Sequence, residues 1–201
     1  MATPMTTSPM TGKQVDRVCE IFRAKITKHA PEFSSEAVQL AFGQSKLSAE
    51  WLAVFRKYVE MFSDMIVRHV KVDRSKTPQE ALDATGRKQF TDKSVVKSMP
   101  KDTGEEKEVF FFKLGHFTSD DDLENEFDSR GLLPVDPYSL AKVNEDDPSF
   151  ADTHPNCTHW RDSDGKWCFA TFNRWDSERR LLVRRSGLGW SDYWWFAGVR
   201  K

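Results

Sequence analysis

The sequence predicts an α+β fold in which amino-terminal helices pack on a carboxy-terminal antiparallel β-meander. Three observations predict it. Apolar residues in the first half recur at helical spacing, the second half consists mainly of short strand-like runs, and tryptophans gather near the carboxyl end. The chain has 201 residues, of which 12% are aromatic, and this aromatic content is typical of a folded chain rather than a disordered one.

We expect three parts along the chain. Residues 1–12 form a disordered tail, residues 13–100 a helical region, and residues 101–201 an α+β region that carries the sheet. The tail lacks the basic start and the apolar core of a signal peptide. Because a chain of this length suits one domain or two small ones that share an interface, the helices and the sheet are expected to form one compact unit.

The clearest helical pattern covers residues 48–70. Its large side chains recur at gaps of three and one, which predicts one amphipathic helix of about six turns. A similar stripe over 14–28 predicts a helix that Pro31 ends, and a short helix then runs to Phe42. We expect the long helix to lay its stripe on the 14–28 helix and on the carboxy-terminal sheet. The stripe consists of Trp51, Val54, Phe55, Tyr58, Val59, Phe62, Met65, Ile66, His69 and Val70.

Capping signals predict further short helices. Thr77 and Glu80 form a capping box with proline at the first helical position. Ser119 begins a helix that ends near Gly131, and Asp136 with the following proline begins another. The acidic run after Ser119 is explained by capping and by the helix macrodipole.

Five runs in the second half are expected to be strands. The run 109–114 reads as a buried strand, and 158–161, 166–175, 179–185 and 193–199 follow it. Asp-Ser-Asp-Gly joins the runs 158–161 and 166–175, and Asp-Ser-Glu joins 166–175 to 179–185. Both sequences are typical of hairpin turns. Together the last four strands predict the antiparallel meander.

The net charge of −1 conceals an acidic middle between two basic ends. Residues 119–152 carry 2 basic and 11 acidic side chains, whereas residues 174–201 carry 7 basic and 3 acidic ones. This division predicts parts that attract one another, and it is also compatible with a basic face for an anionic partner. Nucleic-acid binding by the basic ends is therefore a third hypothesis, although the chain lacks the overall basic excess typical of such proteins.

Cysteine content and hydropathy indicate a compartment. Three cysteines are too few, and odd in number, for a secreted disulfide scaffold. No apolar run approaches the roughly 18 residues of a membrane span. We expect a cytoplasmic protein that does not enter a membrane.

Four side chains in one short segment could bind zinc: His154, Cys157, His159 and Cys168. Their spacing matches no common zinc-finger or ribbon pattern. Cys168 is expected to share a strand face with alanine and phenylalanine and to pack as a small apolar side chain. A metal site therefore stays an alternative, and no cofactor is predicted.

A small enzyme, with or without a dependence on metal, is the alternative function. Its chemistry would lie near His154, Cys157 and His159, with Cys168 or His116 brought in by folding. Such an enzyme needs at least three of these side chains to converge in a cleft. The sequence contains no phosphate-binding glycine loop and no residue that would orient a Cys–His pair.

The preferred hypothesis is a non-catalytic binding module that contacts a protein partner through its carboxy-terminal sheet. The expected surface consists of Trp175, Arg184, Trp190, Trp194 and Trp195, since exposed tryptophan and arginine are typical of interfaces. The competing interpretation is burial, with arginine stems packed along the indole rings. The hypothesis requires that at least two of these tryptophans lie exposed together.

Overall fold

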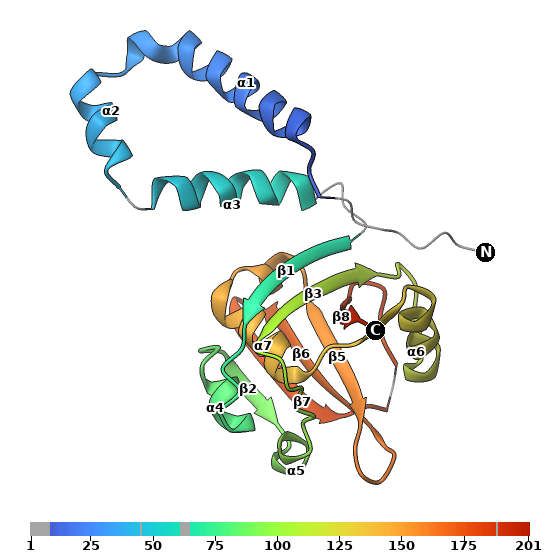
Figure 1. Cartoon of the computed structure of the whole chain (residues 1–201). Helices are drawn as coiled ribbons and strands as arrows, with labels where there is room; N and C mark the ends of the chain where they lie inside the picture. Colours follow the sequence, from blue (N-terminus) through green and yellow to red (C-terminus); the bar gives the residue numbers. More distant parts are fainter. Residues whose placement is uncertain (1–8, 45, 61–64, 188) are drawn as a thin grey trace. The chain divides into compact units, whose positions relative to one another are not determined.

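The computed structural model describes residues 9–44, 46–60, 65–187 and 189–201 (Figure 1). It contains two compact units, a helical unit within residues 6–63 and an α+β unit within residues 64–201. The fold class is therefore α+β, but the expected helical region 13–100 also contains two strands of the second unit. Each unit is described separately below.

The helical unit consists of α1 (Gly12–His29), a short 3-10 turn η1 (Ala30–Glu32), α2 (Ser35–Phe42) and α3 (Leu47–Glu60). Thr11 and Gln14 form a capping box at the start of α1, and Ser34 caps α2. The helices expected over 14–28 and up to Phe42 are confirmed.

Residues 1–8 of the expected tail lie outside the described residues. No helix in the described part of the chain has the length and apolar character needed to cross a membrane.

The predicted continuous helix over 48–70 is wrong. Helix α3 ends at Glu60, and Met65–Lys71 is strand β1 of the α+β unit; residues 61–64 lie outside the described residues. The sequence of β1 fits both periods, but its β-branched Ile66, Val67 and Val70 favour a strand. Pairing with β3 buries Ile66 and Val70 in the sheet core, and this burial outweighs the helical spacing. Residues 65–71 therefore belong to the sheet itself and are not part of a helix packed on it.

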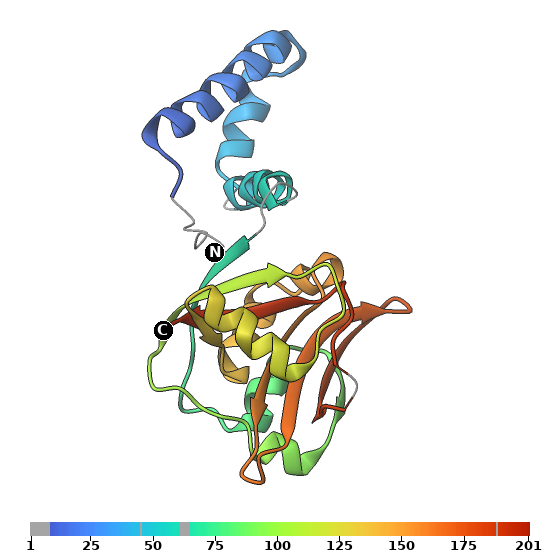
Figure 2. The same ribbon diagram turned by 90° about the vertical axis from the view of Figure 1, so that its right-hand side faces the viewer.

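The α+β unit is built on a sheet of eight strands in the order β1-β3-β8-β5-β6-β7-β2, with β4 pairing with β8 (Figures 1 and 2). The remaining strands are β2 (Lys88–Thr91), β3 (Glu106–Lys113), β4 (Leu132–Pro134), β5 (Asn156–Arg161), β6 (Trp167–Trp175), β7 (Glu178–Arg185) and β8 (Trp195–Arg200).

The expected four-strand meander is not confirmed, because the sheet is mixed. Strands β5, β6 and β7 are antiparallel neighbours, but β8 lies on the other side of β5 and runs parallel to it. The short strand β2 is also parallel to its neighbour β7. The segment 186–194 is long enough to carry the chain past β5 and β6. On arrival, β8 buries Phe196 and Ala197 in opposite faces of the sheet.

Helices cover the two faces unequally. On one face, α4 (Pro78–Asp83), α5 (Lys93–Lys97), α7 (Pro137–Asp146) and α8 (Phe150–Thr153) enclose a core around Phe111 and Phe172. On the other face lies α6 (Asp120–Ser129) (Figure 2). Its Phe127 packs on Phe112, in one cluster with Phe196. Thr77, Ser119 and Asp136 cap α4, α6 and α7, as the sequence predicts. These caps fix the ends of α6 and α7 that lie nearest the site described below.

Gly189 holds the segment before β8 against the start of α6. Its φ is +70°, and a Cβ there would lie 2.7 Å from the carbonyl oxygen of Thr118. Thr118 and Trp190 exchange two backbone hydrogen bonds of 3.0 and 2.8 Å at this point. We expect Gly189→Ala to lower the free energy of unfolding by about 3 kcal/mol, through left-handed backbone strain and loss of this pairing. Denaturant unfolding measures the loss.

The matched control is Gly165→Ala. Gly165 has a similar φ of +73°, but a Cβ at that position would meet no atom within 4 Å. This substitution should cost only the backbone strain of about 1–2 kcal/mol. Equal losses in the two variants would contradict the role of the close contact at Gly189.

Candidate binding cleft between β4 and β5

A cleft opens where β5 separates from β8. Asn156 and Cys157 of β5 are the positions that pair with β8. From Gly198 onward, the edge of β8 that faces β5 pairs with β4 instead. The Thr158 hydroxyl donates to the carbonyl oxygen of Val135 at 2.5 Å, which joins β5 to the end of β4. Beyond this point, residues 158–161 of β5 have no ladder partner on that side within the described ranges.

The free edge of β5 presents backbone hydrogen-bonding groups to this cleft. The N–H of Trp195 donates to the carbonyl oxygen of Pro155 at 2.8 Å, so the backbone groups of Pro155 point toward β8. Because backbone groups alternate sides along a strand, those of Cys157, His159 and Arg161 point the same way. The backbone N–H and C=O groups of His159 and Arg161 lie past the end of the pairing with β8. Another extended chain could therefore pair with them.

The cleft has a volume of about 470 Å³, which lies within the roughly 300–1,000 Å³ typical of ligand pockets. Two of its carboxylates are already held, Asp136 by Arg74 and Asp102 by Lys107. The lining comes from the loop before β3, from α6, from β4 and the residues that follow it, and from β5, β6 and β8. It consists of Pro100, Lys101, Asp102, Glu124, Leu133, Pro134, Val135, Asp136, His159, Trp160, Arg161, Trp167 and Val199.

Two residues that line the cleft carry buried nitrogen atoms for which the described part of the chain offers no hydrogen-bond partner. These atoms are Nε2 of His159 and Nε1 of Trp160, and the two residues are only 2% and 7% exposed. A buried polar group left unpaired costs about 1–3 kcal/mol, so such atoms are uncommon in folded proteins. The indole N–H can only donate a hydrogen bond.

Asp120 fixes the orientation of His159 from the first turn of α6. Its carboxylate lies 3.3 Å from Nδ1 of His159 and accepts hydrogen bonds from the Trp190 indole at 2.8 Å and from the Ser186 hydroxyl at 2.5 Å. Burial acts to raise the pKa of Asp120, whereas the hydrogen bonds from these three side chains act to lower it. The hydrogen bonds together outweigh burial, so the pKa of Asp120 lies below its usual range. With Nδ1 directed at a carboxylate, Nε2 of a neutral His159 is the acceptor.

One wall of the cleft is a rigid stack of side chains. The His159 ring stacks on Trp167 with centroids 4.5 Å apart and planes 6° apart. The Arg161 guanidinium lies 3.9 Å from the centroid of the same indole. Asp121 accepts hydrogen bonds of 2.9 Å from both Arg161 and Trp167. These contacts restrain the side chains that form this wall.

The four zinc-competent side chains do not converge. Cys157 and His159 lie on the α6 side of the sheet, whereas Cys168 belongs to the core on the opposite face, as predicted. His154 stacks on Phe150 at the end of α8. Within the described residues no group of three or more His, Cys, Asp or Glu side chains is placed to hold a metal ion. Burial, with a smaller effect of Asp120, raises the pKa of the Cys157 thiol well above its usual value.

The predicted tryptophan surface is largely buried. Trp175 is 58% exposed and Arg184 is exposed, but Trp190 and Trp194 are only 3% and 9% exposed, and Trp195 packs partly against the core. Of the four tryptophans predicted for this surface, Trp175 alone is exposed. The reason is that Trp190 fills the space between Phe169, Phe196 and His159 on the α6 face.

Several arginines of the carboxyl end are paired with acidic side chains. Arg179 and Arg174 bind Asp152 at 2.7 and 3.2 Å, and Arg185 binds Asp162 at 3.0 Å. These ion pairs support the interpretation in which acidic and basic parts of the chain attract one another. They leave less free positive charge for an anionic partner.

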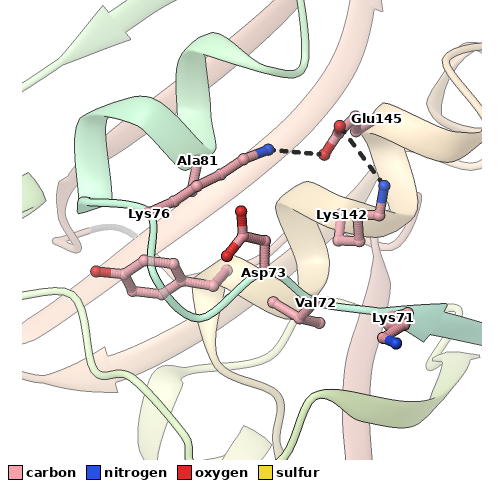
Figure 3. A pocket seen from close by; sticks show the side chains of 8 residues that line it. Lys71, Val72, Asp73, Lys76, Ala81, Lys142 and Glu145 are labelled. Atoms are coloured by element: carbon pink, nitrogen blue, oxygen red, sulfur yellow. Dashed lines mark ion pairs between the residues drawn. The ribbon is translucent and has the colours of Figure 1, made fainter.

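A second, smaller pocket lies between the end of β1, α4 and α7 (Figure 3). Glu145 lies between Lys76 and Lys142, at 3.6 and 3.5 Å, and Lys142 also binds Asp146 at 2.7 Å. The hydrogen bond to Asp146 raises the pKa of Lys142. With a volume of about 70 Å³ and these lysines already paired, the pocket is better explained as part of an ion-pair network that links α7 to the turn before α4.

Comparisons with known proteins give no relative. No family model matches the chain, and no curated protein or solved structure matches it either. A function therefore has to follow from the cleft itself.

Proposed function

We propose that this is a non-catalytic binding protein whose β4–β5 cleft takes up an extended peptide segment of a partner protein. The observation that carries the proposal is the free edge of β5 inside the cleft. Extended peptides bind sheet edges through alternating backbone N–H and C=O groups, and neighbouring pockets then select their side chains.

The two walls of the cleft suit the two sets of side chains of such a peptide. Glu124 and Trp167 line it from the α6 side, and Lys101 lines it from the loop after α5, which belongs to the opposite face. Successive side chains of a strand point to opposite faces. Alternate peptide residues would therefore meet Glu124, Arg161 and Trp167 on one side and Lys101 on the other.

The same side chains are poorly arranged for nucleophilic catalysis. The His159 side chain has 0% exposure, and the Ser186 hydroxyl donates to Asp120 rather than to His159. Burial raises the pKa of the Cys157 thiol, which disfavours the reactive thiolate. These features favour a binding role over the small enzyme considered from the sequence.

A linear peptide library selected against the full chain tests the proposal. The dissociation constant of each selected peptide is then measured for the protein and for Leu133→Trp, which enlarges a 48% exposed side chain that lines the cleft. We expect the dissociation constant to rise at least about tenfold, which corresponds to about 1.4 kcal/mol. The control is Leu52→Trp, an equal change at a 54% exposed leucine in α3, and it should leave the affinity unchanged.

Methylation of single peptide amides provides the second measurement. Only every other amide of a strand faces its neighbour, so methylation should abolish binding at alternate positions and be tolerated between them. Peptides that bind Leu133→Trp with unchanged affinity, or that tolerate methylation at every position, would contradict the proposal. A selection that yields no binder would also contradict it.

A further inference from the structure

We propose that the helical unit binds the helical unit of a second copy of the chain, so that the protein is a dimer through α1, α2 and α3. The starting observation is that neither α1 nor α2 contains a buried residue. In the described part of this unit, twelve large apolar side chains from Val15 to Val59 are at least 40% exposed. This contact is independent of the β4–β5 cleft.

The exposed side chains form stripes along the helices. In α1, Phe22 and Ile26 are 40% and 47% exposed, and in α3, Trp51, Val54 and Tyr58 are 46%, 57% and 61% exposed. Their spacings of three and four residues place each set on one helix face. Short helices are only marginally stable alone in water and gain stability mainly by packing such a face. These faces are therefore expected to be covered in the functional protein.

Both stripes are apolar, and a second copy carries the same two stripes, so a second copy is a partner that they suit. The rings of Phe22 and Trp51 stack within one copy, with centroids 5.6 Å apart and planes 19° apart, yet both remain at least 40% exposed. A twofold dimer needs a surface that is complementary to itself. Residues 9–60 contain eight Lys or Arg and six Asp or Glu, so two copies would repel one another little.

The exposed apolar area is sufficient for a stable dimer. A large apolar side chain has roughly 150–200 Å² of surface, so twelve that are about half exposed provide on the order of 1,000 Å² per copy. A standard interface buries roughly 800 Å² from each partner.

Sedimentation equilibrium of the full chain over a wide concentration range tests the proposal. We expect a species of twice the 23.2 kDa chain mass. The variant Ile26→Glu with Val54→Glu places a charge in both stripes and should raise the dimer dissociation constant at least about a hundredfold. The control, Gln39→Glu with Ser48→Glu, adds the same charge at other exposed positions of α2 and α3 and should leave the dissociation constant unchanged.

Circular dichroism separates loss of the interface from loss of the helices. If the charged variant loses helical signal, Ile26→Ala with Val54→Ala gives the deciding measurement, because alanine is the best helix former. This variant should raise the dissociation constant at least about tenfold. A protein that stays monomeric at every concentration, or a dimer unaffected by the alanine variant, would overturn the proposal.

Discussion

Replacing Arg74 with methionine is expected to lower the free energy of unfolding by about 3–5 kcal/mol. The guanidinium binds the Asp136 carboxylate through two hydrogen bonds of 2.8 and 3.2 Å, and the two side chains are only 11% and 6% exposed. It also donates to the Ser139 hydroxyl and to the carbonyl oxygen of Gly104. Methionine would leave the buried carboxylate of Asp136 without its counter-charge at the start of α7, where it also lines the cleft.

Denaturant unfolding of two further variants shows whether the uncompensated charge causes the loss. Lys88→Met breaks an ion pair with Glu178 whose partners are 55% and 42% exposed, so it should cost less than about 1 kcal/mol. Asp136→Asn in the Arg74→Met background should recover part of the stability, because asparagine still caps α7 but carries no charge. Two outcomes would contradict this explanation. One is that Arg74→Met with Asp136→Asn is no more stable than Arg74→Met alone. The other is that Lys88→Met loses as much unfolding free energy as Arg74→Met.

The features that the sequence predicts well are those decided within a few residues. Thr77, Ser119 and Asp136 cap helices because a side-chain oxygen accepts from a backbone N–H two or three residues further on. The hairpins of β5, β6 and β7 depend on turns that the sequence contains locally. Such signals do not require knowledge of which distant segments will meet.

The errors in the fold arise where distant pairing decides the structure. Residues 65–71 fit both a helical and a strand period, and pairing with β3, about 40 residues away, selects the strand. Strands β2 and β4 contain four and three residues, too few for a periodic signal. The position of β8 between β3 and β5 likewise depends on a crossing that no local pattern encodes.

The site could be predicted only in part. His159 is prominent by residue type, and its segment does form a wall of the cleft, although no metal cluster is found there among the described residues. Asp120 is explained from the sequence as part of a helix start, and nothing local indicates that it also binds His159 and Trp190, 39 and 70 residues further on. The free edge of β5 results from the insertion of β4 beside β8, which only the tertiary structure reveals.

Replacing Asp120 with alanine is expected to lower the free energy of unfolding by about 3 kcal/mol or more at neutral pH. The carboxylate is bonded to His159, Trp190 and Ser186, and its removal leaves these side chains without their partner in a buried position. The control is Asp128→Ala on the same helix, where the carboxylate pairs with Lys201 and is 67% exposed. Loss of that exposed pair should cost less than about 1 kcal/mol.

The Asp120 effect should also depend on pH. The folded-state pKa of Asp120 is lowered, whereas an unperturbed aspartate titrates near about 3.9 in the unfolded chain. The carboxylate therefore contributes its full stabilisation above roughly pH 4–5, and this contribution is lost as the pH falls through the folded-state pKa. The difference in unfolding free energy between the protein and Asp120→Ala should accordingly shrink on acidification. A difference that stays constant from neutral to acidic pH would show that the negative charge of Asp120 does not hold His159, Trp190 and Ser186 in place.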